Sequence, residues 1–225
     1  TIVGVINNSD KIVEKYLATG SGGLQSMSGN RVNSTEIIAA LIEQKDDLAE
    51  GIRYAQGAIE GSASILILRE NGNIIAARDI FGRLPILIGR REDGVCASFE
   101  SFAYEKLGFE PYSELKSGEI SEISPSGVKT LVEGSNEMRI CAFLWTYYGY
   151  PNACYEGVNV EVMRMRNGRI MAEQEKENGT LPEVDYVSGV PDSGTPHAIG
   201  YAHASGCQYA RPFVKYTPAW ARSFI

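Results

Sequence analysis

The chain has 225 residues, of which 44% are hydrophobic and 22% are charged. This composition supplies enough apolar side chains for a packed core and excludes a chain that is disordered throughout. The 21 basic and 28 acidic residues give a formal net charge of −7, which argues against a protein whose main partner is nucleic acid or a membrane surface. A local basic pocket for a phosphate ligand is compatible with this charge.

The sequence shows no membrane span and no targeting segment. No apolar run approaches the roughly 20 residues that a membrane-spanning helix needs, and the first residues lack the features of a signal peptide. Residues 1–5 contain no initiator Met and resemble the inside of a strand, so we expect a chain that begins within a longer protein. Because Cys96, Cys141, Cys154 and Cys207 are widely spaced, we expect reduced thiols and a cytoplasmic location.

Helical patterns dominate the first sixty residues. Residues 8–10 offer a cluster of N-cap side chains and predict a first helix directly after them. The glycine- and serine-rich residues 19–30 predict a loop. A second helix is predicted to begin at residues 33–36, to keep one apolar face as far as Ala55, and to end at residues 60–61.

The pattern then changes to strands. Residues 65–68 predict a buried strand, residues 70–73 an Asn-Gly hairpin turn of type I′, and residues 74–78 the returning strand. Further strands are predicted over residues 84–88, 95–99, 120–123 and 128–131. Helices followed by an antiparallel meander indicate an α+β layered domain over residues 1–132, with residues 133–140 as a linker.

The second half, residues 141–225, forms a different kind of domain. The aromatic residues of the segment 143–150 are expected to be domain-packing core rather than a platform for base stacking. The other predicted elements are a helix over 160–175, a strand over 184–190, a helix over 196–204 that begins with Pro196, and a strand over 209–215. A strand–helix–strand unit joins parallel strands, so this half is predicted to be α/β with a parallel sheet.

The strongest chemical signal is the loop between that strand and helix, residues 191–195. It lies at the carboxyl end of a predicted parallel strand and at a helix start, where free N–H groups suit a phosphate. Gly194 permits close approach of an oxyanion, and Ser193 and Thr195 add hydroxyl donors. Asp192 would repel a bare phosphate but suits a Mg²⁺ ion that stands between carboxylate and phosphate.

Two other interpretations of this loop are open. It is either an ordinary strand–helix turn with hydroxyl caps, or the site of a nucleophilic Ser193, although Pro191 replaces the first glycine of the Gly-x-Ser-x-Gly motif. Weaker candidates lie elsewhere. His197 and His203 do not share a helix face well enough for a metal pair. Residues 20–23 have the glycine content of a phosphate loop, but no strand precedes them.

Six sequence blocks carry a family resemblance. They are residues 76–79 with 82–85, 97–101, 117–120, 141–143 with 147–151, 189–195, and Lys215 with 222–225. In this order they resemble the glutamine phosphoribosylpyrophosphate amidotransferase family, over nearly the whole chain. The resemblance implies a partial N-terminal-nucleophile (Ntn) glutaminase domain with αββα layers over residues 1–132. It also implies the first part of a type I phosphoribosyltransferase domain over residues 141–225.

The resemblance assigns roles to the candidate residues. It makes residues 192–195 the pyrophosphate loop, with Ser193 near the Mg²⁺ ion. It makes Lys215 and Arg222 the cationic ends of a flexible loop that closes over the substrate and stabilises the departing pyrophosphate. Without the resemblance, both would be ordinary solvated charges at a strand end. Cys141 falls at the first ligand position of a 4Fe–4S cluster that only one branch of the family has; otherwise it is a small buried apolar residue.

The glutaminase half departs from the family pattern. The family's Asn-Gly oxyanion pair falls on Val3 and Gly4, and valine has no amide donor. The aspartate that binds the glutamine amine falls on Ser34, which cannot pair with an ammonium group as a carboxylate does. Thr1 does not align with the nucleophilic cysteine, and the Asp-Asp phosphoribosylpyrophosphate motif is absent. The resemblance therefore implies a degenerate glutaminase half in a chain that is incomplete at both ends.

We expect part of an enzyme that forms 5-phosphoribosylamine from phosphoribosylpyrophosphate and glutamine-derived or free ammonia, the first step of purine synthesis, with the 225-residue piece inactive alone. One alternative is a non-catalytic paralogue that serves as a nucleotide-binding regulatory or scaffold protein. A generic α/β phosphate-binding protein, the third hypothesis, predicts that the first half does not form an αββα sandwich. Mg²⁺, purine nucleotides as inhibitors and further copies of the chain are the expected partners.

Overall fold

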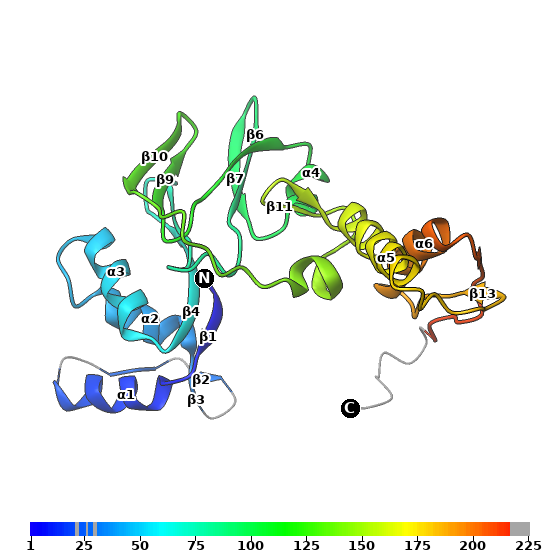
Figure 1. Cartoon of the computed structure of the whole chain (residues 1–225). Helices are drawn as coiled ribbons and strands as arrows, with labels where there is room; N and C mark the ends of the chain where they lie inside the picture. Colours follow the sequence, from blue (N-terminus) through cyan, green and yellow to red (C-terminus); the bar gives the residue numbers. More distant parts are fainter. Residues whose placement is uncertain (21–22, 26, 29–30, 217–225) are drawn as a thin grey trace. The chain divides into compact units, whose positions relative to one another are not determined.

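A computed structural model describes residues 1–20, 23–25, 27–28 and 31–216, and the chain divides into two compact units (Figure 1). Unit 1 is Thr1–Cys141 and unit 2 is Ala142–Ile225. The helices of unit 1 are α1 (Ser9–Ala18), α2 (Ser34–Ile42), α3 (Leu48–Ala58) and α4 (Ser101–Glu105). Its strands are β1 (Ile2–Ile6), β2 (Met27–Ser28), β3 (Arg31–Val32), β4 (Gly61–Leu68), β5 (Ile74–Ala77), β6 (Leu87–Arg91), β7 (Gly94–Ser98), β8 (Glu110–Glu114), β9 (Ile120–Ser124) and β10 (Gly127–Val132).

Unit 1 is built on two antiparallel sheets. The larger has the strand order β1-β4-β5-β9-β10 and the smaller has the order β7-β6-β8. Helices α1, α2 and α3 lie on one side of the larger sheet (Figure 1). The register pairs Ile65 of β4 with Ala77 of β5, and Ala77 with Ile120 of β9. The predicted α+β class with an antiparallel meander is therefore confirmed for this unit.

Alternation along the strands explains why the larger sheet is covered on both faces. Ile65 and Ile75 contact the buried side chains of α2 and α3. Their neighbours Leu66 and Ala76 belong to the core between the two sheets, together with Ile88 of β6. Successive strand residues point to opposite faces, so one continuous apolar strand sequence builds two separate cores.

A short helix covers the outer face of the smaller sheet. Ile88 faces the larger sheet, so its neighbour Gly89 faces away from it. A Cβ atom placed on Gly89 would lie 2.8 Å from the ring of Tyr104, which is in α4. The layers of unit 1 thus follow the order helix, sheet, sheet, helix, with five residues in the last helix.

Three details of unit 1 differ from the sequence-based expectations. The helix predicted from residue 33 to residue 60 is two helices, because the polar residues 43–47 interrupt the apolar face. Asp47 begins the second one by accepting a hydrogen bond from the Glu50 N–H at 2.9 Å. The strand predicted from residue 84 begins at Leu87. Helix α4 and strand β8 were not expected.

Unit 2 contains a parallel strand–helix–strand unit. Its elements are a π-helix η1 (Leu144–Tyr148), β11 (Cys154–Tyr155), β12 (Val158–Asn159), α5 (Val160–Glu177), β13 (Tyr186–Val187), α6 (Gly194–Ser205) and β14 (Gln208–Tyr209). Strands β13 and β14 pair in parallel on either side of α6 in the sequence. The predicted parallel pairing is confirmed, and so is the predicted long helix that became α5.

Other expectations for unit 2 were wrong. Strand β13 has two residues rather than seven, and Val184 and Val190 are exposed, so this strand is not of the buried type. Helix α6 begins at Gly194, which makes Pro196 its third residue; the N–H groups of the first turn have no helical partner, so proline is tolerated there. The aromatic run is not core: Phe143, Tyr147 and their neighbours Tyr148 and Tyr150 are exposed.

A buried arginine fixes the π-helix against α5. Arg164 is 2% exposed, and its guanidinium donates to the backbone oxygen of Trp145 at 2.7 Å and of Gly149 at 2.8 Å. These two carbonyls lie at the π-helix and at its C-terminal end. Burial lowers the pKa of Arg164, because desolvation penalises its charge.

Candidate functional site

The predicted phosphate loop joins β13 to α6. Ser193 is the N-cap residue of α6, and its side chain makes no capping hydrogen bond. Inside the loop, the Gly194 N–H donates to the Val190 oxygen at 3.0 Å and the Thr195 N–H donates to the Asp192 oxygen at 3.2 Å. Two of the amides that the sequence offered to a ligand are therefore used by the loop itself.

Four donors in this loop are still open to a ligand. Within the part of the chain that the structure describes, the backbone N–H groups of Asp192 and Ser193 and the hydroxyls of Ser193 and Thr195 have no hydrogen-bond partner. Adjacent backbone amides at a helix N-terminus, with the positive end of the helix dipole behind them, favour an anion. The ordinary strand–helix turn predicts that these hydroxyls cap the helix, and the Ser193 side chain does not.

The sequence analysis did not single out Gly189, which the loop requires. A Cβ atom on Gly189 would lie 2.4 Å from the Gly194 oxygen and 2.7 Å from the Thr195 Cα atom. At Gly194 itself an added Cβ would make ordinary contacts, the nearest at 3.7 Å. The close backbone approach that shapes the loop is thus at Gly189. A glycine inside the strand predicted over residues 184–190 was the available signal.

An ion pair connects two of the predicted site residues. The Lys215 Nζ atom lies 3.0 Å from the Asp192 Oδ2 atom, and both side chains are exposed. An exposed ion pair contributes little to stability. This pair nevertheless places the positive charge of Lys215 next to a side chain of the loop. Arg222, the second predicted cation, lies outside the described residues, as does the segment 217–221.

A cavity of about 350 Å³ lies beneath the loop, between β13, α5 and α6. The Ser188 hydroxyl in its wall is buried and has no hydrogen-bond partner among the described residues. His197 also lines it, and its Nε2 atom lies 3.2 Å from the Thr146 oxygen, so this side chain contacts the π-helix. A hydrogen bond to Glu175 is the main reason that the pKa of Tyr201 is raised to about 12.

The three positions that the resemblance predicts to be degenerate glutaminase positions lie in unit 1. Val3 and Gly4 are in the edge strand β1, opposite Ser64 and Ala63 of β4. A Cβ atom on Gly4 would lie 2.0 Å from the Ser62 oxygen, so the strand pairing itself explains this glycine. Ser34 is the first residue of α2. Val3 has no side-chain amide, and Ser34 has no carboxylate.

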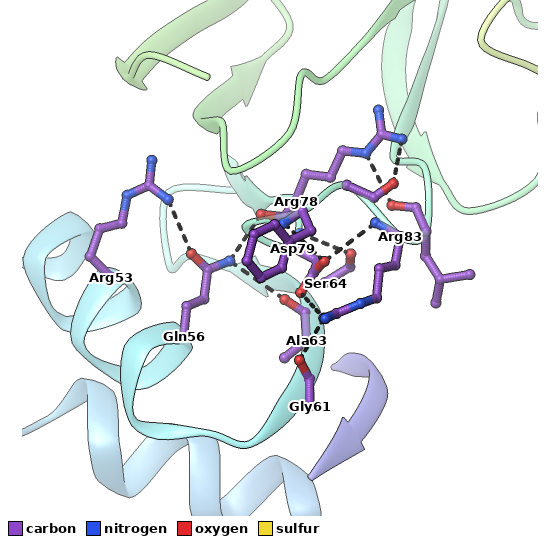
Figure 2. Close-up of polar contacts among 11 residues, drawn as sticks. Arg53, Gln56, Gly61, Ala63, Ser64, Arg78, Asp79 and Arg83 are labelled. Atoms are coloured by element: carbon purple, nitrogen blue, oxygen red, sulfur yellow. Dashed lines mark hydrogen bonds and ion pairs between the residues drawn. The ribbon is translucent and has the colours of Figure 1, made fainter. Parts of the chain in front are cut away.

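The first sequence block of the resemblance forms a buried corner after β5, and Figure 2 shows its contacts. The Arg78 side chain is fully buried and donates to the backbone oxygens of Leu84, Leu115 and Gly82 at 3.1, 2.5 and 2.9 Å. Asp79 accepts hydrogen bonds from the Phe81 and Arg83 N–H groups. This block therefore has a structural role in unit 1.

Metal ligands are sparse in the structure. Across residues 1–20, 23–25, 27–28 and 31–216, no three His, Cys, Asp or Glu side chains are grouped to hold a metal ion. All four cysteines are free; Cys141 is exposed, and burial raises the pKa of Cys96. The loop offers the Asp192 carboxylate and the Ser193 hydroxyl, which fits Mg²⁺ completed by substrate and water oxygens rather than a protein-only site. No helix in the described ranges is both long and apolar enough to cross a membrane.

Comparisons with known proteins agree with the resemblance in the sequence. No protein-family model matches the chain. Amidophosphoribosyltransferase of Bacillus subtilis is 31% identical over 186 residues, which cover 81% of this chain and 38% of that protein. The enzyme of Archaeoglobus fulgidus is 29% identical over 188 residues (81% and 40%), and that of Mus musculus is 28% identical over 233 residues (94% and 44%). The chain spans about two fifths of the length of these curated relatives.

Two solved structures have the same fold. The glutamine phosphoribosylpyrophosphate amidotransferase of B. subtilis, complexed with ADP and GMP, matches 96% of this chain and 46% of its own chain, with a TM-score of 0.82 and 28% identity. A structure of the allosteric regulatory enzyme of purine biosynthesis matches 100% of this chain and 46% of its own, with a TM-score of 0.81 and 28% identity. These relatives are transferases. The chain is homologous to part of the amidophosphoribosyltransferases, which confirms the resemblance seen in its sequence.

Proposed function

We propose that the chain is part of an enzyme that forms 5-phosphoribosylamine from phosphoribosylpyrophosphate and ammonia, the first step of purine synthesis. Residues 1–132 would be the glutaminase-type (Ntn) domain, residues 133–140 the linker, and residues 141–225 the first part of the phosphoribosyltransferase domain. The observation that carries the proposal is the loop of residues 191–195. The loop offers a diphosphate two open amides and two hydroxyls as hydrogen-bond donors. The nearby Lys215 offers it a positive charge.

Each group in the loop has a role in this proposal. The amides of Asp192 and Ser193 and the Thr195 hydroxyl would donate to the pyrophosphate oxygens. The Asp192 carboxylate and Ser193 hydroxyl would hold Mg²⁺, which neutralises charge on the departing diphosphate. Lys215 would add a second positive charge at the same place, and Arg222 is proposed as its partner. The amides of Asp192 and Ser193 are fixed by the backbone before the substrate arrives, so they need little reorganisation.

The glutaminase half points to ammonia as the nitrogen source. Val3 and Ser34 lack the amide and carboxylate that glutamine hydrolysis uses in the family, so we propose a degenerate glutaminase domain. The same two losses support the alternative, a non-catalytic paralogue that binds nucleotides as a regulatory or scaffold protein. A 4Fe–4S cluster at Cys141, feedback by purine nucleotides, assembly into a homo-oligomer and a cytoplasmic location are still predictions from the resemblance.

Binding of Mg²⁺–pyrophosphate to the 225-residue chain tests the proposed function. We expect calorimetric titration to show binding that weakens at least tenfold in the double variant Ser193→Ala/Thr195→Val, because each hydroxyl donates to a charged oxygen. Thr180→Val, at an exposed threonine of the same unit, is the matched control and should bind as the unaltered chain does. Absence of binding, or equal binding by the double variant, would contradict the proposal.

Enzyme assays separate the proposal from its alternative. The full-length protein that contains this chain is expected to make phosphoribosylamine with ammonia and not with glutamine, whereas the 225-residue chain alone is expected to make none. Activity with glutamine would show that the glutaminase half is not degenerate. Nucleotide binding without any activity would favour the regulatory or scaffold protein.

Replacing Asp192 with asparagine tests the proposed place of Mg²⁺. Without Mg²⁺, pyrophosphate should bind a few times more tightly to Asp192→Asn, because a repelling charge is gone and Lys215 loses its partner. With Mg²⁺, binding should weaken, because a metal ligand is lost. The control is Asp185→Asn, an exposed aspartate just before β13. If Mg²⁺ enhances binding equally in both variants, Asp192 does not hold the ion.

A further inference from the structure

A second cavity, distant in sequence from the proposed loop, lies among the helices of unit 1. It has a volume of about 480 Å³ and is enclosed by α1, the end of α2 and α3. Three of its lining side chains are cations: Lys11 and Lys15 of α1, and Arg53 of α3. No Asp or Glu is among its described lining residues. In a chain with a formal net charge of −7, this is a local excess of positive charge.

Two helices supply these cations to the wall of the cavity. Lys11 and Lys15 are four residues apart on one helix, so they share a face and repel each other. Neither lysine, nor Arg53, forms an ion pair with any residue that the structure describes. Arg53 is half-buried, and its guanidinium is 3.4 Å from the Gln56 Oε1 atom (Figure 2). Burial lowers the pKa of Arg53, because its charge is partly desolvated.

Aromatic rings complete the wall. Tyr16 of α1 and Tyr54 of α3 both line the cavity. A further cation, Lys45, lies with its Nζ atom 5.0 Å from the centre of the Tyr54 ring. Tyr54 is held by a hydrogen bond from its hydroxyl to the Gln44 side chain at 3.2 Å. The cavity therefore offers positive charge without carboxylates, together with flat apolar surfaces.

We propose that this cavity binds a small organic phosphate that carries an aromatic ring, of the nucleoside phosphate class. The phosphate groups are bound by Lys11, Lys15 and Arg53, and they relieve the repulsion between the two lysines. The ring packs against the tyrosine side chains. The site does not depend on the proposed catalytic function, because every residue that lines it is in unit 1 and the pyrophosphate loop is in unit 2.

Titration of the 225-residue chain with ADP tests this site. We expect saturable binding that weakens at least tenfold in the double variant Lys11→Gln/Lys15→Gln and that weakens in high salt for the unaltered chain. The charge-matched control is Lys106→Gln/Lys129→Gln, which removes two exposed lysines of the same unit outside the cavity and should leave binding unchanged. Hydrogen exchange of both double variants should match that of the unaltered chain, which shows that the fold is intact.

Two further titrations separate the parts of the ligand. Pyrophosphate should bind more weakly than ADP and with the same dependence on Lys11 and Lys15, and adenosine should bind weakest. Equal ADP affinity in the two double variants would overturn the site. Equal affinity for pyrophosphate and ADP would overturn the role of the tyrosine rings. ADP could also lose its affinity in Ser193→Ala/Thr195→Val and keep it in Lys11→Gln/Lys15→Gln. That result would show that ADP binds at the pyrophosphate loop, and it would overturn the site in unit 1.

Discussion

Replacing Arg78 with methionine is expected to lower the free energy of unfolding of unit 1 by about 3–5 kcal/mol. The Arg78 guanidinium is fully buried and donates hydrogen bonds to three backbone oxygens, and the Glu114 carboxylate lies 3.7 Å away. Methionine fills much of the volume but donates nothing, so the three carbonyls lose their partner. Leaving a buried acceptor without a donor costs about 1–3 kcal/mol.

Hydrogen exchange gives a measurement that is specific to this unit. Amides of β5 and β9, which flank the buried corner, should exchange faster in Arg78→Met in proportion to the lost stability. Arg69→Met is the matched control, because Arg69 is about half exposed and its guanidinium lies 3.9 Å from the Glu122 carboxylate. We expect that control to change stability by less than about 1 kcal/mol. Equal losses in both variants would show that the Arg78 contacts do not hold unit 1 together.

The elements predicted well from the sequence are those whose signal is local. The hairpin around residues 70–73 was predicted from its Asn-Gly sequence and is confirmed, but its turn is not type I′, because Gly72 has a positive φ (+82°) and Asn71 does not. Strands β9 and β10 followed from the same kind of local pattern. By contrast, the contact between Arg78 and the Leu115 oxygen joins positions 37 residues apart. No pattern in the sequence indicates such a partner. Helix α4 was missed because five residues are too few to show a helical period, and β8 was missed because it contains Pro111.

The candidate site shows the same limit. The loop of residues 191–195 could be predicted, because a strand and a helix flank hydroxyl and glycine residues. The use of the Gly194 and Thr195 amides within the loop could not, because it depends on backbone geometry. Nor could the pairing of Lys215 with Asp192, across 23 positions. The cationic cavity of unit 1 was missed because Lys11, Lys15 and Arg53 come from two helices whose packing determines whether their side chains meet.

Replacing Gly168 with alanine is expected to destabilise unit 2 by about 2–4 kcal/mol. A Cβ atom at this position in α5 would lie 1.8 Å from the His197 oxygen of α6. The contact is reciprocal, since a Cβ atom on Gly200 of α6 would lie 2.0 Å from the Met165 oxygen of α5. Alanine would otherwise stabilise a helix by about 1 kcal/mol relative to glycine. Because backbone atoms cannot yield as a flexible side chain does, the clash outweighs this gain.

Displacement of α6 by Gly168→Ala should also change the geometry of the loop that precedes this helix. Helix α6 begins directly after Ser193, so moving it away from α5 moves the open donors of the proposed pyrophosphate site. We expect Gly168→Ala to weaken Mg²⁺–pyrophosphate binding as well as to lower the denaturation midpoint, followed by the fluorescence of Trp145 in η1. The control is Arg169→Ala, at the next and exposed position of α5. Stability equal to or above that of the unaltered chain would show that the two helices separate at little cost, and that their close contact does not position the loop.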